Sequence, residues 1–130
     1  MIKGISHITF VVKDLNLTAD LFKGIFNAKE AYSSSTAKYL LINDLWIALN
    51  NGEPLPQRTY NHIAFQISED EIEKYMTIIS SFGLEIKPSR SREVGEKYSI
   101  YFYDYDNHLF ELHTGSLQDR LKCYSKGELA

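Results

Sequence analysis

Two short segments of the chain carry a histidine at the same place in similar apolar surroundings. They read Ser6-His7-Ile8-Thr9-Phe10 and Asn61-His62-Ile63-Ala64-Phe65. If these are two copies of one duplicated strand, the fold brings the His7 and His62 imidazoles to face one another, as in a metal site. A lone strand histidine is more often a hydrogen-bonded core residue, so the matched placement of the two is what favours metal binding.

A carboxylate is the third candidate ligand. Glu111 lies in the apolar stretch Leu109-Phe110-Glu111-Leu112-His113, where an isolated buried charge would be costly. Pairing with a cation removes most of that cost, and a His-His-Glu set suits a divalent metal while leaving positions open for water or substrate. The alternative is an edge-strand carboxylate that faces solvent. The remaining histidines, His108 and His113, have no counterpart in the first segment, so we expect them to be supporting or structural.

The composition limits the classes of function. The chain has 130 residues, of which 44% are apolar and 24% charged, enough for one domain with a real core. Its net charge of −3, with no basic stripe, argues against nucleic-acid and anionic-membrane partners. The single cysteine, Cys123, cannot form an intramolecular disulfide. Because no signal-peptide core or membrane-spanning run is present, we expect a cytoplasmic protein.

The elements expected along the chain repeat one order, β-α-β-β-β. In the first copy we expect a helix over 15–25, capped by Asn16 and ended by Asn27. In the second copy Ser68 and Glu71 form a capping box, and Gly83 stops the helix that follows. The expected strands are 5–12, 30–34, 38–42 and 45–50 in the first copy, and 60–67, 85–88, 98–103 and 108–114 in the second.

These elements predict an α+β fold in which two βαβββ modules form a metal-binding cup. We expect a single domain over 1–130, with module one at 4–50, a connector at 51–58 and module two at 59–114. A C-terminal helix at 116–125 would pack outside the modules. The strand at 45–49, equivalent to the one that carries Glu111, offers no carboxylate, so the cup would have three protein ligands and an open site.

At these residues the chain resembles the vicinal oxygen chelate (glyoxalase/bleomycin resistance) superfamily, and within it the fosfomycin resistance proteins. The resemblance covers nearly the whole chain and is closest to the FosX branch, manganese-dependent hydrolases that open the fosfomycin epoxide with water. The motifs that carry it are the segments 4–9, 59–65, 99–104 and 106–115, and Leu117-Gln118-Asp119-Arg120-Leu121.

The resemblance implies a set of site residues and a cofactor. His7, His62 and Glu111 match the metal ligands of the family, and Mn²⁺ is the implied cofactor, with other divalent metals possible. Thr9, Tyr101 and Arg120 match catalytic positions. The positions that match the substrate pocket are Thr9, Tyr39, Trp46, Tyr101 and Arg120, to which we add Arg92 from the basic segment 87–92. Arginine suits a phosphonate because its planar fork donates two hydrogen bonds.

One departure from the FosX pattern concerns the nucleophile. The general-base glutamate of that branch falls near Ala37, in the hairpin Ser33-Ser34-Ser35-Thr36-Ala37-Lys38, which has no carboxylate. In length this hairpin looks more like those of the FosA and FosB branches, which add a thiol. The missing base favours thiol addition, but the overall sequence resemblance favours the hydrolase, so we expect water addition first and thiol addition second. Other superfamily activities, namely isomerase, dioxygenase or drug sequestration, are further alternatives. The resemblance also implies a homodimer in which two chains supply one metal site.

Overall fold

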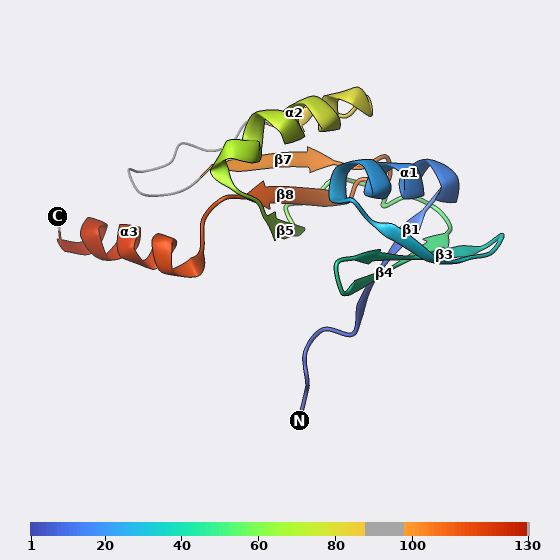
Figure 1. Cartoon of the computed structure of the whole chain (residues 1–130), viewed down its shortest axis with the longest axis horizontal. Coiled ribbons are helices and arrows are strands. Elements are labelled where there is room, and N and C mark those ends of the chain that lie inside the picture. The colour runs from blue at the N-terminus through green and yellow to red at the C-terminus, as the bar shows by residue number, and fades with distance from the viewer. Residues whose placement is uncertain (88–97, 130) are drawn as a thin grey trace. The chain divides into compact units, whose positions relative to one another are not determined.

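The structure is a computed structural model that describes residues 1–87 and 98–129. The chain forms two compact units, and most of the elements are labelled in Figure 1. Unit 1 consists of Met1–Thr59 and Asp104–His108, and unit 2 of Tyr60–Tyr103 and Leu109–Ala130. Within the described ranges, no helix combines the length and the apolar character needed to cross a membrane.

Unit 1 contains one four-stranded mixed sheet in the order β1-β4-β3-β2. Its elements are β1 (His7–Val12), α1 (Leu15–Phe26), β2 (Lys29–Ser33), β3 (Ala37–Ile42) and β4 (Leu45–Asn51). The β1–β4 pair is parallel, and the β3–β4 and β2–β3 pairs are antiparallel. The first strand begins at His7, two residues later than predicted.

Unit 2 repeats this arrangement in the order β5-β8-β7-β6. Its elements are β5 (His62–Gln66), the 3-10 turn η1 (Glu69–Glu71), α2 (Ile72–Ser81), β6 (Ile86–Lys87), β7 (Ser99–Tyr103), β8 (Leu109–His113) and α3 (Leu117–Leu129). Again the first pair, β5–β8, is parallel and the others are antiparallel. The predicted α+β fold with two βαβββ modules is confirmed.

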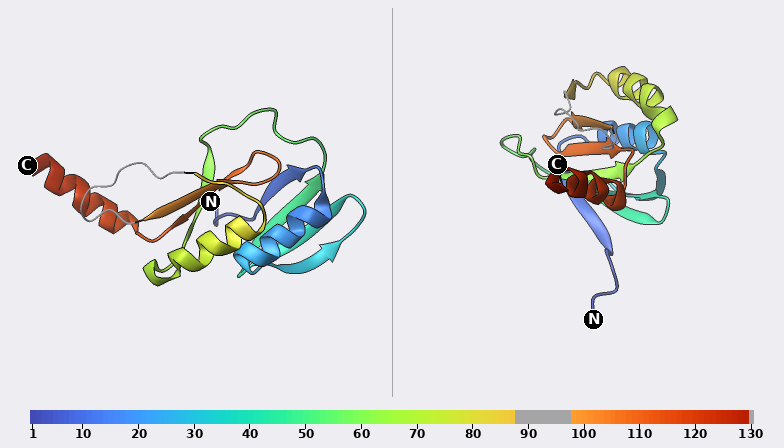
Figure 2. Two further views of the ribbon diagram at one scale, coloured as in Figure 1. Left: turned by 90° about the horizontal axis from the view of Figure 1, so that it is seen from above. Right: turned by 90° about the vertical axis from the view of Figure 1, so that its left-hand side faces the viewer.

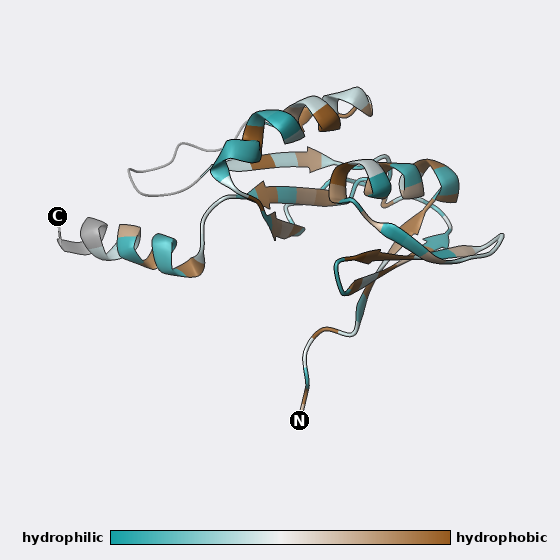
Figure 3. Cartoon of the chain, viewed as in Figure 1, coloured by the Kyte–Doolittle hydropathy of each residue, from teal (hydrophilic) through white to brown (hydrophobic). Residues whose placement is uncertain are grey.

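The alternation of side chains along each strand decides which face of a sheet is covered. In unit 1, Phe10, Val12 and Leu40 are buried on the face against which α1 packs its own apolar side chains. Figure 2 shows α1 lying along the first sheet and α2 along the second. Figure 3 shows apolar residues interrupted by polar ones along both helices, as expected of helices with one buried face. The opposite face of the first sheet presents His7 and Thr9, which are exposed.

The same rule places the core and the polar face of unit 2. Phe102 on β7 and Phe110 on β8 are fully buried, with their rings stacked 5.7 Å apart. Their neighbours Tyr101 and Glu111, which pair across the same two strands, point to the opposite face. The period-two pattern of β7 and β8 therefore puts an aromatic core on one side of the sheet and the chemistry-bearing residues on the other.

The N-terminal cap of α1 differs from the prediction. The cap is Asp14, whose carboxylate accepts a hydrogen bond from the Leu17 backbone N–H at 3.0 Å, and Asn16 is the second residue of the helix. At the other end, Asn27 adopts the left-handed conformation and ends the helix as predicted. In the second unit the Ser68–Glu71 capping box and the left-handed Gly83 are both present.

A pair of substitutions tests the cap. Asp14→Ala is expected to lower the free energy of unfolding by about 1 kcal/mol, because it leaves one N-terminal N–H of α1 without its side-chain acceptor. Asn16→Ala is expected to change it much less, since Asn16 lies inside the helix. Urea unfolding of both variants measures the difference. An equal loss in both would contradict the assignment of Asp14 as the cap.

The Asp104–His108 turn buries two carboxylates. Asp104 accepts hydrogen bonds from the Asp106 N–H at 2.8 Å and from the N–H and Nδ1 of His108 at 2.9 and 2.8 Å. Asp106 is only 2% exposed and accepts a hydrogen bond from the Lys13 N–H at 2.9 Å. Burial raises the pKa of Asp106, and the neighbouring Asp104 carboxylate adds to the rise.

The raised pKa of Asp106 makes the free energy of unfolding depend on pH in a direction that unfolding experiments can detect. The stability that protonated Asp106 contributes is present below its ordinary pKa of 3.8 and is lost as pH rises through the higher folded-state pKa. Asp106→Asn keeps an acceptor for the Lys13 N–H but cannot ionise. Its stability relative to the parent chain is therefore expected to improve as pH rises from below 3.8 to neutrality in urea unfolding series. A difference that is constant with pH would contradict this.

Candidate metal centre

His62 and Glu111 meet on the polar face of the second sheet. The parallel β5–β8 register pairs His62 with Leu109 and Ala64 with Glu111, which puts the histidine and the carboxylate on adjacent strands. The distance from His62 Nε2 to Glu111 Oε1 is 3.0 Å. Because β8 lies between β5 and β7 and Glu111 is only 5% exposed, the alternative of a solvent-facing edge-strand carboxylate is wrong.

The Tyr60 carbonyl oxygen determines which ring nitrogen of His62 carries the proton. Its Nδ1 lies 2.7 Å from the Tyr60 carbonyl oxygen, which only accepts, so Nδ1 carries a proton. In the neutral ring Nε2 then has a lone pair that faces the Glu111 carboxylate. Two electron pairs in this arrangement call for a cation, either a proton or a metal ion, between or beside them.

The spacing of the two atoms fits a metal ion. Two ligands at right angles, each with a bond of about 2.1 Å, are separated by about 3.0 Å. The observed 3.0 Å between His62 Nε2 and Glu111 Oε1 matches this value. Imidazole and carboxylate are also ligand types that first-row divalent ions accept. The donor pair therefore fits a divalent metal ion in its chemistry and in its spacing, which is also the spacing of a hydrogen bond.

Hydrogen bonds hold the Glu111 carboxylate ionised. The Ser99 hydroxyl donates to Oε2 at 2.5 Å, and His113 Nδ1 lies 3.2 Å from the same oxygen. Burial alone raises the pKa of Glu111, but hydrogen bonds from Ser99 and Tyr101 and the nearby imidazoles lower it by more, so the net pKa lies below its usual value. The carboxylate is thus charged at neutral pH.

Tyr101 stays a hydrogen-bond donor beside this carboxylate. Its hydroxyl lies 3.3 Å from that of Tyr60, and the residue is 9% exposed. Burial, the Tyr60 hydroxyl and the Glu111 charge all raise the pKa of Tyr101. A phenol that does not ionise can donate to a carboxylate or to an anionic substrate.

A hollow of about 310 Å³ opens beside the pair and brings Arg120 to it. Arg120 lies in the first turn of α3, which is fixed by reciprocal capping between Ser116 and Asp119 at 3.1 and 3.2 Å. The structure therefore gathers three of the predicted residues around one hollow. The residues that line it are His62, Ala64, Glu111, His113, Gly115, Ser116, Leu117 and Arg120.

The predicted residues of unit 1 form a cluster of their own. His7 pairs with Trp46 across β1 and β4, their ring centroids 4.2 Å apart, and Tyr39 lies 5.2 Å from Trp46. Thr9 and Tyr39 both pair with Ala48 from opposite sides. The Trp46 indole N–H is buried without a hydrogen-bond partner among the described residues. This face of the first sheet therefore carries an exposed imidazole, an exposed hydroxyl and a buried indole N–H without a hydrogen-bond partner among the described residues.

The two registers explain why only one unit supplies a carboxylate. His7 pairs with Trp46 as His62 pairs with Leu109, and Ala48 holds the place that Glu111 holds in unit 2. Within the described ranges no three His, Cys, Asp or Glu side chains are placed so that they could hold one metal ion together, so His62 and Glu111 are found as a pair. The full set of His7, His62 and Glu111 stays a prediction, and Arg92 lies outside the described residues.

Sequence reasoning missed the supporting residue Ser99. Its signal was the period-two pattern of β7, because Ser99 and Tyr101 alternate onto the face that carries Glu111. His113 and His108 were expected to be supporting, and each does pair with a carboxylate, His113 with Glu111 and His108 with Asp104.

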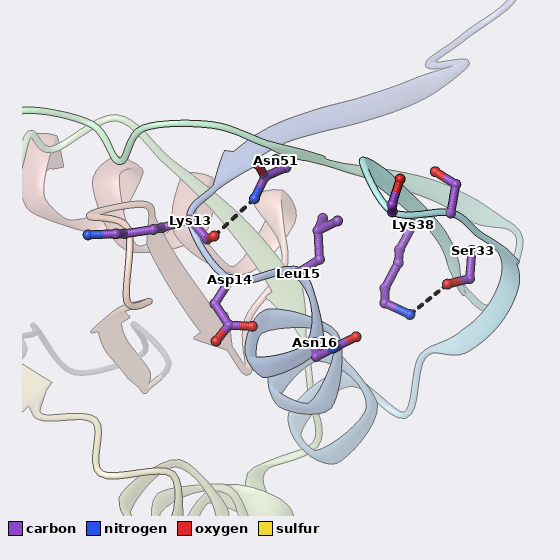
Figure 4. A pocket seen from close by; sticks show the side chains of 9 residues that line it. Lys13, Asp14, Leu15, Asn16, Ser33, Lys38 and Asn51 are labelled. Carbon is purple, nitrogen blue, oxygen red and sulfur yellow. Dashed lines mark hydrogen bonds between the residues drawn. The ribbon is translucent and has the colours of Figure 1, made fainter.

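A second hollow, of about 530 Å³, lies at the start of α1 in unit 1 (Figure 4). Figure 4 shows the Asn51 amide bonded to the Lys13 carbonyl and the Lys38 ammonium bonded to Ser33. Lys38 also binds Glu30 at 3.0 Å, so its charge is already compensated. This hollow is a polar surface to which we assign no chemistry.

Known proteins with similar sequences and structures agree on one family. The model of the Glyoxalase/Bleomycin resistance protein/Dioxygenase superfamily matches residues 4–112. The chain is 56% identical to the fosfomycin resistance protein FosX of Listeria innocua, over 97% of this chain and 100% of that protein. It is 39% identical to the metallothiol transferase FosB of Staphylococcus saprophyticus, over 97% of this chain and 86% of that one.

A solved structure extends the likeness to the fold. It is a variant of FosX from Listeria monocytogenes in complex with Mn(II) and 1S,2S-dihydroxypropylphosphonic acid. The TM-score is 0.92 at 57% sequence identity, over 95% of this chain and 99% of that one. By sequence and fold, this chain belongs to the FosX family of fosfomycin resistance proteins within the glyoxalase superfamily.

Proposed function

We propose that this protein inactivates fosfomycin by opening its epoxide with water. The reaction uses a divalent metal ion, for which Mn²⁺ is the first candidate. The observation that carries the proposal is the buried Glu111 carboxylate with its Oε1 3.0 Å from the Nε2 of His62. The diol phosphonate in the similar FosX structure is the product that water addition to this epoxide gives. The presence of Mn(II) in that structure supports the choice of metal.

His62, Glu111 and, as the third ligand, His7 would hold the metal. A metal ion bound here supplies Lewis-acid chemistry, drawing charge from the epoxide oxygen as its bond to carbon breaks. The chain's own residues bind and orient the substrate. Arg120 binds the phosphonate through its planar fork, and the neutral Tyr101 hydroxyl donates a further hydrogen bond to it.

The face of the first sheet that carries Thr9, Tyr39 and Trp46 supplies the remaining contacts with the substrate in this proposal. Thr9 is an exposed hydroxyl that donates to the epoxide oxygen as negative charge develops there. Trp46, with its unpartnered indole N–H, and Tyr39 line the pocket and exclude water from the hydrocarbon part of the substrate. Arg92 is proposed as an additional phosphonate contact, from the basic segment in which it lies.

Product analysis tests the reaction. The purified protein is incubated with Mn²⁺ and fosfomycin, with and without glutathione, cysteine or bacillithiol, and products are followed by phosphorus NMR. Diol formed without thiol is the expected result. Turnover that requires a thiol would overturn water addition in favour of the thiol transferase reaction.

Arg120→Lys is expected to weaken substrate binding because lysine cannot donate the two parallel hydrogen bonds that an arginine guanidinium gives to a phosphonate.

Thiol transfer is the second candidate because of one feature of unit 1. The turn between β2 and β3, where Ser34 accepts the N–H groups of Thr36 and Ala37, carries no carboxylate. Without a base in that hairpin, a nucleophile that ionises readily, such as a thiol, has an advantage over water. The likeness to the FosB metallothiol transferase is consistent with this candidate.

We also propose that the protein works in the cytoplasm as a homodimer whose second copy supplies His7 to the site. Mixing two inactive variants tests this. If ligands come from different chains, refolding His7→Ala together with Glu111→Ala restores one intact site in each mixed dimer, about a quarter of parental activity at equal mixing. If all three ligands come from one chain, the mixture stays inactive.

A further inference from the structure

We propose that Ser99, backed by His113, is a positioning residue that holds Glu111 as a one-oxygen metal ligand. The inference rests on the proposed function, because it concerns the carboxylate assigned there to the metal. It goes beyond that assignment in naming what orients this ligand and in predicting how the ligand binds.

The two oxygens of Glu111 have different neighbours. Oε1 faces His62 Nε2 at 3.0 Å, whereas Oε2 receives the Ser99 hydroxyl at 2.5 Å and lies 3.2 Å from His113 Nδ1. Glu111 and Ser99 are 5% and 7% exposed, so these contacts are made away from solvent. The carboxylate is therefore held at Oε2 by the Ser99 hydroxyl, while Oε1 faces the imidazole of His62.

The directions of the protons follow from the chemistry of the three groups. An ionised carboxylate only accepts, so the single Ser99 hydroxyl proton lies on the Ser99–Glu111 contact. His113 Nδ1 is 2.7 Å from Ser99 Oγ, and since the serine proton is already committed, Nδ1 must donate. The Ser99 hydroxyl thus donates to Oε2, and His113 supports this hydroxyl by donating its Nδ1 proton to the serine oxygen.

This arrangement sets how Glu111 can bind a metal. Rotating the carboxylate to offer both oxygens would break the short buried hydrogen bond from Ser99 to Oε2, which is costly in the interior. Oε1 alone is presented beside His62 Nε2. A one-oxygen ligand keeps a coordination position free, which an enzyme needs for a substrate oxygen.

The register between β7 and β8 brings the side chains of this arrangement to the same face of the second sheet. Ser99 pairs with His113 and Tyr101 pairs with Glu111 across β7 and β8, so all four alternate onto one face. Supporting groups that orient metal ligands typically change metal affinity by about 10- to 100-fold when they are removed.

Metal binding and spectroscopy test the proposal without relying on turnover. Ser99→Ala is expected to weaken Mn²⁺ binding by about 10- to 100-fold and to change the Mn²⁺ electron paramagnetic resonance spectrum, because the freed Oε2 alters the ligand geometry. Ser99→Thr keeps the hydroxyl and is expected to restore both. Thr114→Val is the matched control: it removes a hydroxyl that bonds the Tyr98 backbone on the same strand pair, away from Glu111.

A second pair of variants keeps the test decisive if Ser99→Ala folds poorly. His113→Asn retains an N–H donor near the Nδ1 position and is expected to bind Mn²⁺ more tightly than His113→Leu, which retains none. Parental binding and spectra in Ser99→Ala, or equal binding in the two His113 variants, would overturn the positioning role while leaving the proposed function intact. A parent chain that binds no Mn²⁺ would overturn both.

Discussion

Replacing Glu111 with glutamine is expected to lower fosfomycin turnover by about 10³-fold or more, the largest effect of any single substitution. The amide removes the negative charge that the metal requires and keeps only one acceptor oxygen. If that oxygen accepts the Ser99 hydroxyl, the NH₂ group faces the metal position; if it faces the metal position, the NH₂ group faces Ser99. Mn²⁺ titration and phosphorus NMR on the same preparation measure the two losses together.

Glu73→Gln is the matched control for this substitution, because Glu73 is an exposed carboxylate on α2 that contacts none of the site residues described above. It is expected to leave metal binding and turnover unchanged. If Glu111→Gln bound Mn²⁺ as the parent does, the assignment of Glu111 as a ligand would fail, whatever happened to activity.

Introducing a carboxylate at position 37 is expected to raise thiol-independent hydrolysis by about 10²-fold, the scale of a positioned general base. Ala37 is half-buried on β3, pairs with Asn50, and alternates onto the same face as Tyr39, where the substrate is proposed to lie. Ala37→Glu therefore supplies a proton acceptor for attacking water at the position where the FosX pattern has one.

Ala37→Gln has the same shape without the basicity and is the control. The two variants are compared by diol formation without thiol, and for each the thiol-dependent rate is measured alongside. If diol formation without thiol rises in Ala37→Glu and not in Ala37→Gln, water is the nucleophile and the lack of a general base limits the parent reaction. No gain in hydrolysis, with thiol addition retained, would favour the transferase reaction.

Much of the fold followed from local patterns that act over a few residues. The switch from period two in β1 to a helical period in α1, and the Ser68–Glu71 capping box, predicted elements that the structure contains. The one capping error, Asn16 in place of Asp14, arose because both residues lie at the start of the helix and only the backbone geometry decides whether the carboxylate or the amide reaches the Leu17 N–H.

The candidate site was predictable as a list of residues and not as an arrangement. His7 and His62 stood out because a duplicated strand repeats its chemistry, and Glu111 because a charge in an apolar strand calls for a partner. Strand order and register, which join residues 49 positions apart, decided that Glu111 lies inside the sheet and within 3.0 Å of His62.

The sequence by itself thus determined the residue types of the site, since side-chain period and composition are local properties. Only the tertiary structure decided how they are held: Ser99, which accepts the His113 Nδ1 proton, donates its own proton to one oxygen of Glu111, and the Tyr60 carbonyl directs the lone pair of His62 to the other. The reason is physical. Hydrogen-bond direction depends on which strands are neighbours, and that choice is made by burial of the Phe102 and Phe110 side of the sheet, far along the chain from His62.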